Sequence, residues 1–211
     1  MTKPILFDYF RSSAAYRARI ALNLKGVDYE SASVDLLHGA HKEEAYRARN
    51  PQGFVPMLEI DGHRITQSIA IADYLDATRS GIRLLPESPG DRAHVLALAL
   101  IVACDIHPLN NLRVLKYLGG PLGQEESARD AWYAHWVREG FAALEALAAP
   151  RAGAFLFGDA PTLADICLVP QMFNARRFKV PIDDFPLLVR ADAEANGLEA
   201  FAAAHPDRVA P

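Results

Sequence analysis

Short apolar runs alternate with segments of helical periodicity over the first eighty residues. The runs that predict β-strands lie at residues 5–9, 29–35, 55–60 and 63–66. Helical patterns are predicted over residues 12–25, at the end of the polar stretch 36–49, and over 67–77. The predicted order of elements is therefore β-α-β-α-β-β-α.

Two glycines indicate where elements of this order end. Gly26 is placed to end the first helix. Asp61-Gly62 lies between two strand candidates and is a strong two-residue hairpin signal. The complete order is the pattern of a thioredoxin-like domain.

The second half of the chain has a helical pattern throughout. Residues 78–90 contain two prolines and two glycines, which is typical of a linker. Helices are predicted over 91–118, 125–149, 162–177 and about 187–204. We expect an α/β domain over residues 1–80, a linker over 81–90 and an all-helical domain over 91–211.

One helix start carries a clear local signal. Thr162 stands at a predicted N-cap and Asp165 follows three residues later, close to a capping box. This pair is expected to stabilise the helix, so we leave it out of the candidate site.

Composition limits the classes of function. The 211 residues are 51% hydrophobic and 23% charged, as in a protein with a substantial core. The formal net charge is −4 and charges of both signs are mixed, which argues against nucleic acid as a partner. The sequence has neither a long apolar signal segment nor an apolar run of membrane-spanning length, so we expect a soluble cytoplasmic protein.

The two cysteines, Cys104 and Cys167, both fall inside apolar helical patterns. Without a secretory context they are expected to be buried thiols and not a disulfide. Neither lies near the candidate site in sequence, so thiol chemistry would need a thiol from outside the protein.

The candidate site begins in the turn between the first strand and the first helix. Arg11, Ser12 and Ser13 stand there, where a helix N-terminus offers free N–H groups and the positive end of its dipole. A serine in this place caps the helix or donates its hydroxyl to an anion. For an isolated Ser-Ser pair, capping is the commoner role.

Five segments resemble the zeta class of the glutathione transferases, which includes maleylacetoacetate isomerases. They are Arg11-Ser12-Ser13-x-x-Tyr16-Arg17-x-Arg19-Ile20-Ala21-Leu22, Asn50-Pro51-Gln52 with Val55-Pro56, Gln67-Ser68, Asp105 to Asn111, and Arg177-Phe178-Lys179-Val180. The resemblance spans essentially the whole chain. It implies a thioredoxin-like domain followed by a helical domain, glutathione as cofactor, and a homodimer.

The sequence departs from the family motif at two positions. The motif commonly reads Ser-Ser-Cys-x-Trp, whereas here Ala14 replaces the cysteine and Tyr16 the tryptophan. Side reactions that use the motif's thiol are therefore in doubt, while the hydroxyls remain.

The resemblance implies cis–trans isomerisation of a double bond flanked by carbonyls. A glutathione thiolate adds to a conjugated carbon, the resulting single bond rotates, and the thiolate leaves unchanged. We take Ser12 as the main hydrogen-bond donor to the thiolate, aided by Ser13. A plain capping role for Ser13 is equally compatible with the sequence.

Glutathione must also be held at its ends. Pro56 resembles the cis-proline of thioredoxin-like folds, which would present the backbone of Val55 to the cysteinyl amide. Gln67 and Ser68, at a helix start, suit the γ-glutamyl carboxylate, and His41 suits the glycyl end. Ser68 could also act as an N-cap, and the two roles can coexist.

No metal is expected at the polar loop after the second strand. Its side chains are of types that bind metals, but two histidines on such a loop are usually solvated. The residues concerned are His38, His41, Glu43 and Glu44.

The implied substrate is a dicarboxylate, and arginine binds carboxylates with a planar fork. We assign this role to Arg11 and Arg177, which we count with Ser12 and Ser13 as catalytic. His107 and Asn111, four residues apart, are expected on one helical face and are assigned with Arg113 to cofactor binding. A polar helix-packing pair is the alternative for His107 and Asn111.

Four functions stay open at this point. The leading hypothesis is conversion of maleylacetoacetate to fumarylacetoacetate in tyrosine or homogentisate breakdown, and the close alternative is maleylpyruvate isomerisation. The others are a general conjugating transferase or dehalogenase, and a glutathione-binding module without catalysis. The sequence does not separate the first two.

Overall fold

The computed structural model describes residues 3–211. The chain divides into two units, and the first of them contains a four-stranded sheet. Unit 1 comprises the chain up to Leu84 together with Gly197–Pro211, and unit 2 comprises Leu85–Asn196. The thioredoxin-like fold expected for the N-terminal part is confirmed by this sheet and its helices.

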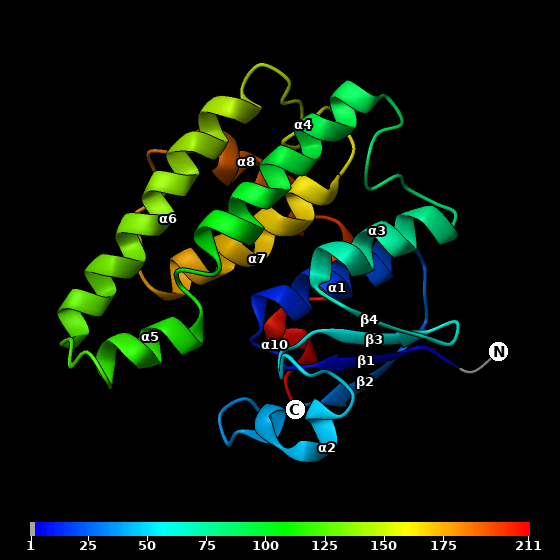
Figure 1. Cartoon of the computed structure of the whole chain (residues 1–211). Helices are drawn as coiled ribbons and strands as arrows, with labels where there is room; N and C mark the ends of the chain where they lie inside the picture. Colours follow the sequence, from blue (N-terminus) through cyan, green and yellow to red (C-terminus); the bar gives the residue numbers. More distant parts are fainter. Residues whose placement is uncertain (1–2) are drawn as a thin grey trace. The chain divides into compact units, whose positions relative to one another are not determined.

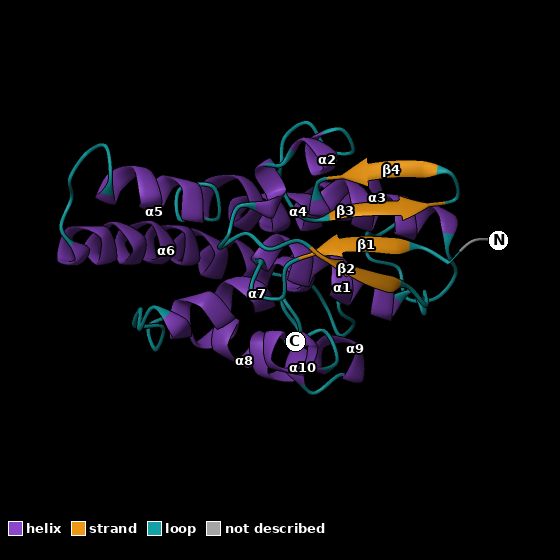
Figure 2. Cartoon of the chain, turned by 90° about the horizontal axis from the view of Figure 1, so that it is seen from below, coloured by secondary structure: helices purple, strands orange, loops and turns teal. Residues whose placement is uncertain are grey.

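The sheet of unit 1 is mixed and has the strand order β2-β1-β3-β4. Its strands are β1 (Ile5–Asp8), β2 (Glu30–Ser33), β3 (Met57–Ile60) and β4 (His63–Thr66). β1 runs parallel to β2 and antiparallel to β3, which in turn pairs antiparallel with β4. Figure 2 shows the four strands side by side.

Helices cover both faces of this sheet. α1 (Ser13–Leu24) and α3 (Ser68–Thr78) pack against each other on one face, and α2 (Glu44–Arg47) lies on the other side, preceded by the 3-10 helix η1 (Ala40–Lys42) (Figure 1). α1 is buried along almost its whole length because it lies between the sheet, α3 and the C-terminal segment.

The predicted hairpin is confirmed. Asp61 and Gly62 both have positive φ, 51° and 78°, as a two-residue turn of the primed type requires. The Tyr74 hydroxyl and the Arg79 guanidinium both donate to the Asp61 carboxylate, and these bonds, with Arg79's the stronger influence, lower the pKa of Asp61.

The last fifteen residues group with unit 1 and contain α9 (Glu199–Ala202) and α10 (Pro206–Val209). Two side chains of α1 hold them: Arg19 Nε donates to the Ala204 carbonyl at 3.0 Å, and Asn23 Nδ2 to the Ala200 carbonyl at 2.9 Å. The domain boundaries expected from sequence stay a prediction. Helical periodicity predicts that a segment forms a helix, but it does not predict which part of the chain that helix packs against.

Unit 2 is helical. Its elements are α4 (Pro89–Leu100), the π-helical segment η2 (Ile101–Ile106), α5 (Leu112–Gly119), α6 (Glu126–Ala148), α7 (Leu163–Arg177) and α8 (Pro186–Asn196). α7 is the central helix, buried over most of its length and packed against both α4 and α8. The helical C-terminal part expected from sequence is confirmed.

Two predicted helices are wrong as continuous elements. The helix expected over 91–118 changes to π geometry at Ile101 and is interrupted between Ile106 and Leu112. A Cβ on Gly140 of α6 would lie 2.3 Å from Ile106 Cγ1, so η2 packs closely on α6 at this point. The helix expected over 187–204 ends at Asn196, and α9 begins a separate turn.

The capping box at the start of α7 is confirmed. Thr162 Oγ1 accepts from the Ala164 amide, and the Asp165 carboxylate accepts from both the amide and the hydroxyl of Thr162. Asp165 also accepts from the Leu156 amide, so it ties the preceding loop to the helix. Burial outweighs these bonds and raises the pKa of Asp165 to about 6.

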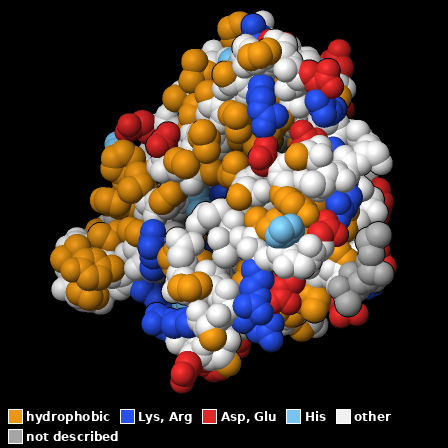
Figure 3. Space-filling view, turned by 45° about the vertical axis from the view of Figure 1, so that its right-hand side comes forward, with side chains coloured by type: hydrophobic (Ala, Val, Ile, Leu, Met, Phe, Trp, Pro, Cys, Tyr) orange, Lys and Arg blue, Asp and Glu red, His pale blue; other side chains and the backbone are white. Residues whose placement is uncertain are grey.

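The surface carries charges of both signs, and the two cysteines are not paired with each other. Acidic and basic side chains stand beside one another on the face in Figure 3, in keeping with a net charge of −4. None of the helices within residues 3–211 has the length and hydropathy needed to cross a membrane. Both cysteines are free thiols; Cys167 is buried as predicted, but Cys104 is exposed on η2, so its predicted burial is wrong.

Candidate functional site

The Ser12 turn lies between β1 and α1. Ser12 is the N-cap of α1, and its Oγ accepts from the Ala15 amide at 3.2 Å. A hydroxyl oxygen that accepts this bond still carries a proton that it can donate. Capping and anion binding are therefore compatible at Ser12, which is half-buried at the surface of unit 1.

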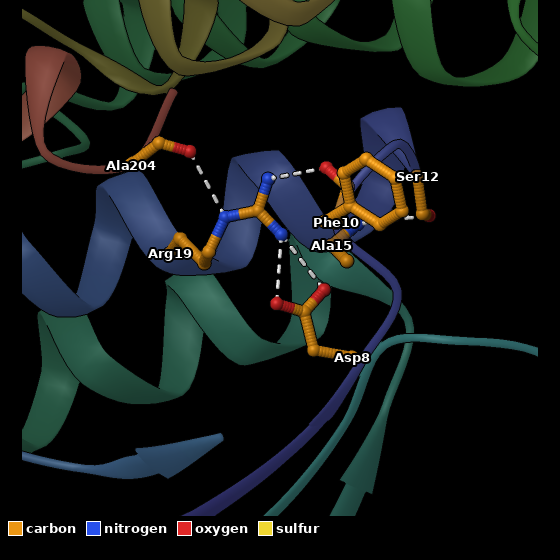
Figure 4. A network of polar contacts seen from close by, with 6 residues as sticks. All are labelled: Asp8, Phe10, Ser12, Ala15, Arg19 and Ala204. Atoms are coloured by element: carbon orange, nitrogen blue, oxygen red, sulfur yellow. Dashed lines mark hydrogen bonds and ion pairs between the residues drawn. The ribbon is translucent and has the colours of Figure 1, made fainter. Parts of the chain in front are cut away.

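A buried ion pair between Asp8 and Arg19 lies next to this turn (Figure 4). Arg19 Nη1 contacts both carboxylate oxygens of Asp8, at 2.7 and 2.8 Å, and Arg19 Nη2 donates to the Phe10 carbonyl at 3.1 Å. Both side chains are almost completely buried. The pair thus connects the end of β1, the middle of α1 and the residue that precedes Arg11.

The other residues of the turn differ in exposure. Ser13 is buried as the first residue of α1, whereas Arg11 is exposed and its guanidinium lies 4.9 Å from the centre of the Phe10 ring. Tyr16 is 1% exposed and meets His205 edge to face, so it is a core residue in this chain.

The loop before β3 is fixed by side chains that grip one carbonyl. Asn50 Nδ2 and the Tyr46 hydroxyl both donate to the Phe54 carbonyl, at 2.7 and 2.6 Å. The next peptide bond, between Val55 and Pro56, is cis, as the resemblance implied. The backbone of Val55 is therefore held in a defined position.

His41 lies across this loop. Gly53 has φ of 63°, and a Cβ there would lie 2.7 Å from the His41 carbonyl oxygen. A glycine is therefore needed where η1 crosses the loop before β3, and this crossing brings His41 near the Val55 segment. His38 forms a close pair with Asp35 and is otherwise exposed.

The start of α3 is the second helix N-terminus of the candidate site. Gln67 is the N-cap with an unusual positive φ of 69°, and its side chain donates to Gln52 Oε1 at 2.9 Å instead of capping the helix. Ser68 follows as the first helical residue and is buried. Arg17 Nη1 of α1 donates to the Ser68 Oγ at 3.3 Å, and Arg17 is only 3% exposed.

In unit 2, Arg177 stands at the last position of α7. It is exposed, and its guanidinium lies 4.8 Å from the centre of the Phe178 ring. Phe178 in turn stacks on Tyr133 with ring centres 4.0 Å apart. Burial raises the pKa of Tyr133 to about 12, although the charge of Arg177 acts in the opposite direction. The neighbouring Arg176 pairs with Asp192 of α8.

The expectation that His107 and Asn111 share one helical face is wrong. η2 ends at Ile106, and Asn111 begins a new helix as the N-cap of α5, where its Oδ1 accepts from the Arg113 amide at 3.1 Å. His107 lies in the turn before it. The spacing of four residues therefore spans a break, and a helical face cannot relate the two side chains.

A small pocket of about 150 Å³ lies beside the Tyr133–Phe178 stack in unit 2. It is lined by Leu115, Glu126, Arg129, Asp130, Tyr133 and Phe178. Two carboxylates and one guanidinium give this lining a net negative charge, so it is a poor site for a dianion.

Two family models match the chain. The N-terminal domain of glutathione S-transferase matches residues 3–77, and its C-terminal domain matches residues 126–204. A maleylacetoacetate isomerase of Rhizobium meliloti is 53% identical over 98% of this chain and 98% of its own. A bacterial maleylpyruvate isomerase of the zeta class, solved in its holo form, is 45% identical with a TM-score of 0.95 and covers 98% of both chains.

The chain belongs to the zeta class of the glutathione S-transferases. A third relative, maleylacetoacetate isomerase of Methylobacterium extorquens AM1, was solved with bound malonate and glutathione; it is 40% identical, has a TM-score of 0.93 and covers 97% of each chain. Glutathione is accordingly the cofactor of this class of protein.

The donors of this transferase fit glutathione. Two helix N-termini in unit 1 carry hydroxyls, at Ser12 and Ser68, and a buried cation stands behind the second. Such positions stabilise anions, and glutathione presents a thiolate and two carboxylates. The capping signal of serine located the start of α1 at Ser12. At α3 the alternative role of Ser68 as an N-cap is wrong, because Gln67 is the N-cap and Ser68 is the first helical residue.

Sequence reasoning missed the residues that support the site. Arg17 and Asn50 belong to segments that resemble the family, but the sequence predicts no role for them, since a charged or amide side chain on its own is more often a surface residue. Both are 3% exposed or less. Periodicity contained a usable signal: Arg17 falls among apolar residues on the buried face of α1.

Proposed function

We propose that this transferase is a glutathione-dependent cis–trans isomerase that converts maleylacetoacetate to fumarylacetoacetate. The observation that carries the proposal is the Ser12 hydroxyl at the N-terminus of α1, with its oxygen engaged by the Ala15 amide and its proton available for an anion. A relative 53% identical to it bears the name of this activity.

When bound, glutathione supplies a thiolate that adds reversibly to the conjugated double bond and allows rotation about it. The protein's part is to favour the ionised sulfur. An ordinary thiol has a pKa of about 8.5, and lowering it by about two units requires roughly 2.7 kcal/mol. A hydroxyl bond to an anion contributes about 1.5–3 kcal/mol and a helix N-terminus about 0.3–1. Ser12 and the end of α1 therefore suffice without a general base, and Ser13 supports the same turn.

We assign most of the remaining contacts with glutathione to residues of unit 1. Ser68 and Gln67 at the start of α3 take the γ-glutamyl carboxylate, and the backbone of Val55 before Pro56 pairs with the cysteinyl amide. His41 takes the glycyl end. For Ser68, Gln67 and the segment before Val55, neighbouring side chains hold the donor or the backbone in position.

Three residues of unit 2, His107, Asn111 and Arg113, complete the proposed cofactor set. Asn111 caps α5 through its Oδ1, so its Nδ2 group is the part that suits an acceptor on the ligand. Arg113 is an exposed cation in the first turn of the same helix.

The proposed substrate is a small dicarboxylate, and we assign its carboxylates to Arg11 and Arg177. Both guanidinium groups are exposed and lie over aromatic rings, which restrict their orientation. A relative was solved with malonate, a dicarboxylate, beside glutathione.

Maleylpyruvate is the second candidate substrate, favoured by the likeness to a maleylpyruvate isomerase with a TM-score of 0.95. The purified protein is given maleylacetoacetate, maleylpyruvate and a halogenated acid in turn, and kcat/KM is compared. The proposal expects the highest value for maleylacetoacetate and constant total thiol. Net consumption of glutathione would favour a conjugating or dehalogenating enzyme, and binding without turnover a non-catalytic module.

We further propose that the protein acts as a homodimer in the cytoplasm. Large apolar side chains such as Tyr117 and Leu122 are more than half exposed, 58% and 52%, and a partner subunit would cover such groups. Light scattering tests this point: a mass twice the 23.1 kDa of one chain supports it, and a mass equal to one chain overturns it.

A further inference from the structure

Arg17 is a buried cation that contacts the proposed anion site from inside the protein. It projects from α1, is 3% exposed, and donates through Nη1 to the Ser68 Oγ at 3.3 Å. Ser68 is itself 5% exposed and is the first residue of α3.

The direction of this bond restricts the hydroxyl. A guanidinium group only donates hydrogen bonds, so the Ser68 oxygen must be the acceptor. The single hydroxyl proton then points to a different partner. Donation from a charged group also polarises the hydroxyl and makes its proton a stronger donor.

Arg19, two residues further along α1, provides the contrast. Its charge is compensated by the Asp8 carboxylate, and its other donors hold the carbonyls of Ala204 and Phe10. These contacts join elements of the fold. The contact of Arg17 with Ser68 instead ends at a residue that the proposed function assigns to the ligand.

We propose that Arg17 is a positioning residue for the γ-glutamyl carboxylate of glutathione. It fixes the Ser68 hydroxyl as a donor toward that carboxylate, and its buried charge adds to the positive potential at the start of α3. This inference rests on the proposed function, because it takes the same glutathione site as given.

The test compares two ligands that differ only at the γ-glutamyl group. S-methylglutathione and S-methylcysteinylglycine are titrated calorimetrically into the wild type, Arg17→Met, Arg17→Lys and Ser68→Ala. We expect Arg17→Met to weaken the binding of S-methylglutathione about 10- to 100-fold, which is the range for loss of a charge-assisted hydrogen bond. Its affinity for the truncated ligand should stay within about twofold, and Arg17→Lys should restore part of the loss.

A double-mutant cycle and kinetics separate positioning from a structural role. Ser68→Ala should produce a similar loss, and the double variant should lose little more than either single one, because the two residues act as one unit. KM for glutathione should rise while kcat at saturating glutathione changes less. Arg19→Met, the matched loss of a buried arginine, should lower thermal stability without discriminating between the ligands.

Equal losses for both ligands, or additive losses in the cycle, would overturn the inference. If Arg17→Met does not fold, Arg17→Lys and Ser68→Ala still provide the ligand comparison and the cycle. Failure of the wild type to bind S-methylglutathione would overturn the proposed function itself, which distinguishes that failure from a failure of the role of Arg17.

Discussion

At the scale of single residues, Ser12 combines two tasks that are usually treated as alternatives. Its oxygen closes the N-terminus of α1 by accepting from the Ala15 amide, while its proton remains for an anion. Ser68 repeats this division at α3, except that its oxygen accepts from the buried Arg17. A hydroxyl serves both tasks because it accepts and donates along different directions.

Replacing Ser12 with alanine tests the first of these pairs. The Ser12→Ala variant should raise the pKa of the bound glutathione thiol and lower kcat/KM about 10- to 100-fold, because a hydrogen bond to the anion is lost. The thiolate absorbance of the complex, titrated against pH, measures the pKa directly. Ser12→Thr, which keeps both the cap and a hydroxyl, should retain much more activity. Turnover of Ser12→Ala within a few-fold of wild type would contradict this account of thiolate activation.

Asp165 predicts a pH dependence of stability. Burial raises its pKa from 3.8 to about 6 in the folded protein, so between these values the folded state binds more protons than the unfolded one. Its contribution to the free energy of unfolding therefore decreases by about 3 kcal/mol in total as pH rises from about 4 to about 6, and is constant above that.

Denaturant titrations of the wild type and Asp165→Asn across this range measure the effect. The difference in unfolding free energy, wild type minus variant, should become smaller toward pH 6. A difference that grows with pH would mean that the ionised carboxylate is favoured in the folded state.

At the scale of elements, the buried ion pair between Asp8 and Arg19 joins several parts of unit 1. Asp8 at the end of β1 and Arg19 in α1 lie 2.7 Å apart, and Arg19 also holds the Ala204 carbonyl of the C-terminal segment. A strand, a helix and a distant part of the chain therefore depend on the same guanidinium group (Figure 4).

Asp8→Asn should destabilise the protein by about 3–5 kcal/mol, because it leaves the Arg19 charge buried without its counter-charge. Chemical denaturation measures this. The double variant Asp8→Leu with Arg19→Met should lose less than the sum of its single changes, since both charges are then absent. A loss below about 1 kcal/mol for Asp8→Asn would show that water reaches the pair.

Gly140 makes a second prediction for an element, the π-helical segment η2. Alanine normally stabilises a helix relative to glycine by about 1 kcal/mol, but a Cβ at Gly140 would lie 2.3 Å from Ile106 Cγ1. Gly140→Ala should therefore destabilise by about 1–2 kcal/mol through overpacking. Gly90→Ala in α4 has open space around it and serves as the control, with no loss of thermal stability expected.

Features that depend on neighbouring residues could be predicted from the sequence, and features that depend on distant residues could not. Local signals predicted the helix starts at Ser12 and Thr162 and the hairpin at Asp61, because each depends on neighbours a few residues away. The break after η2 was missed because it accompanies close packing of Ile106 on Gly140, which lie far apart in the chain. The burial of Arg17 was missed for the same reason: its partner Ser68 is 51 residues away.

At the scale of the whole molecule, the two units divide the proposed work. Unit 1 contains both serine-bearing helix starts and the Val55 segment, and unit 2 contributes Arg177 and the residues around Asn111. The departure at Ala14 removes the motif's cysteine without touching these hydroxyls. The sulfur chemistry of the proposed reaction therefore belongs to the cofactor alone.

The most direct test of this account follows maleylacetoacetate by ultraviolet absorbance with purified protein, with and without glutathione, coupled to the hydrolase that consumes fumarylacetoacetate. Total thiol is measured in the same samples. Rapid loss of absorbance only with glutathione, at constant total thiol, is the predicted result. Equal rates without glutathione, or one thiol consumed per turnover, would contradict an isomerase that uses glutathione as a regenerated cofactor.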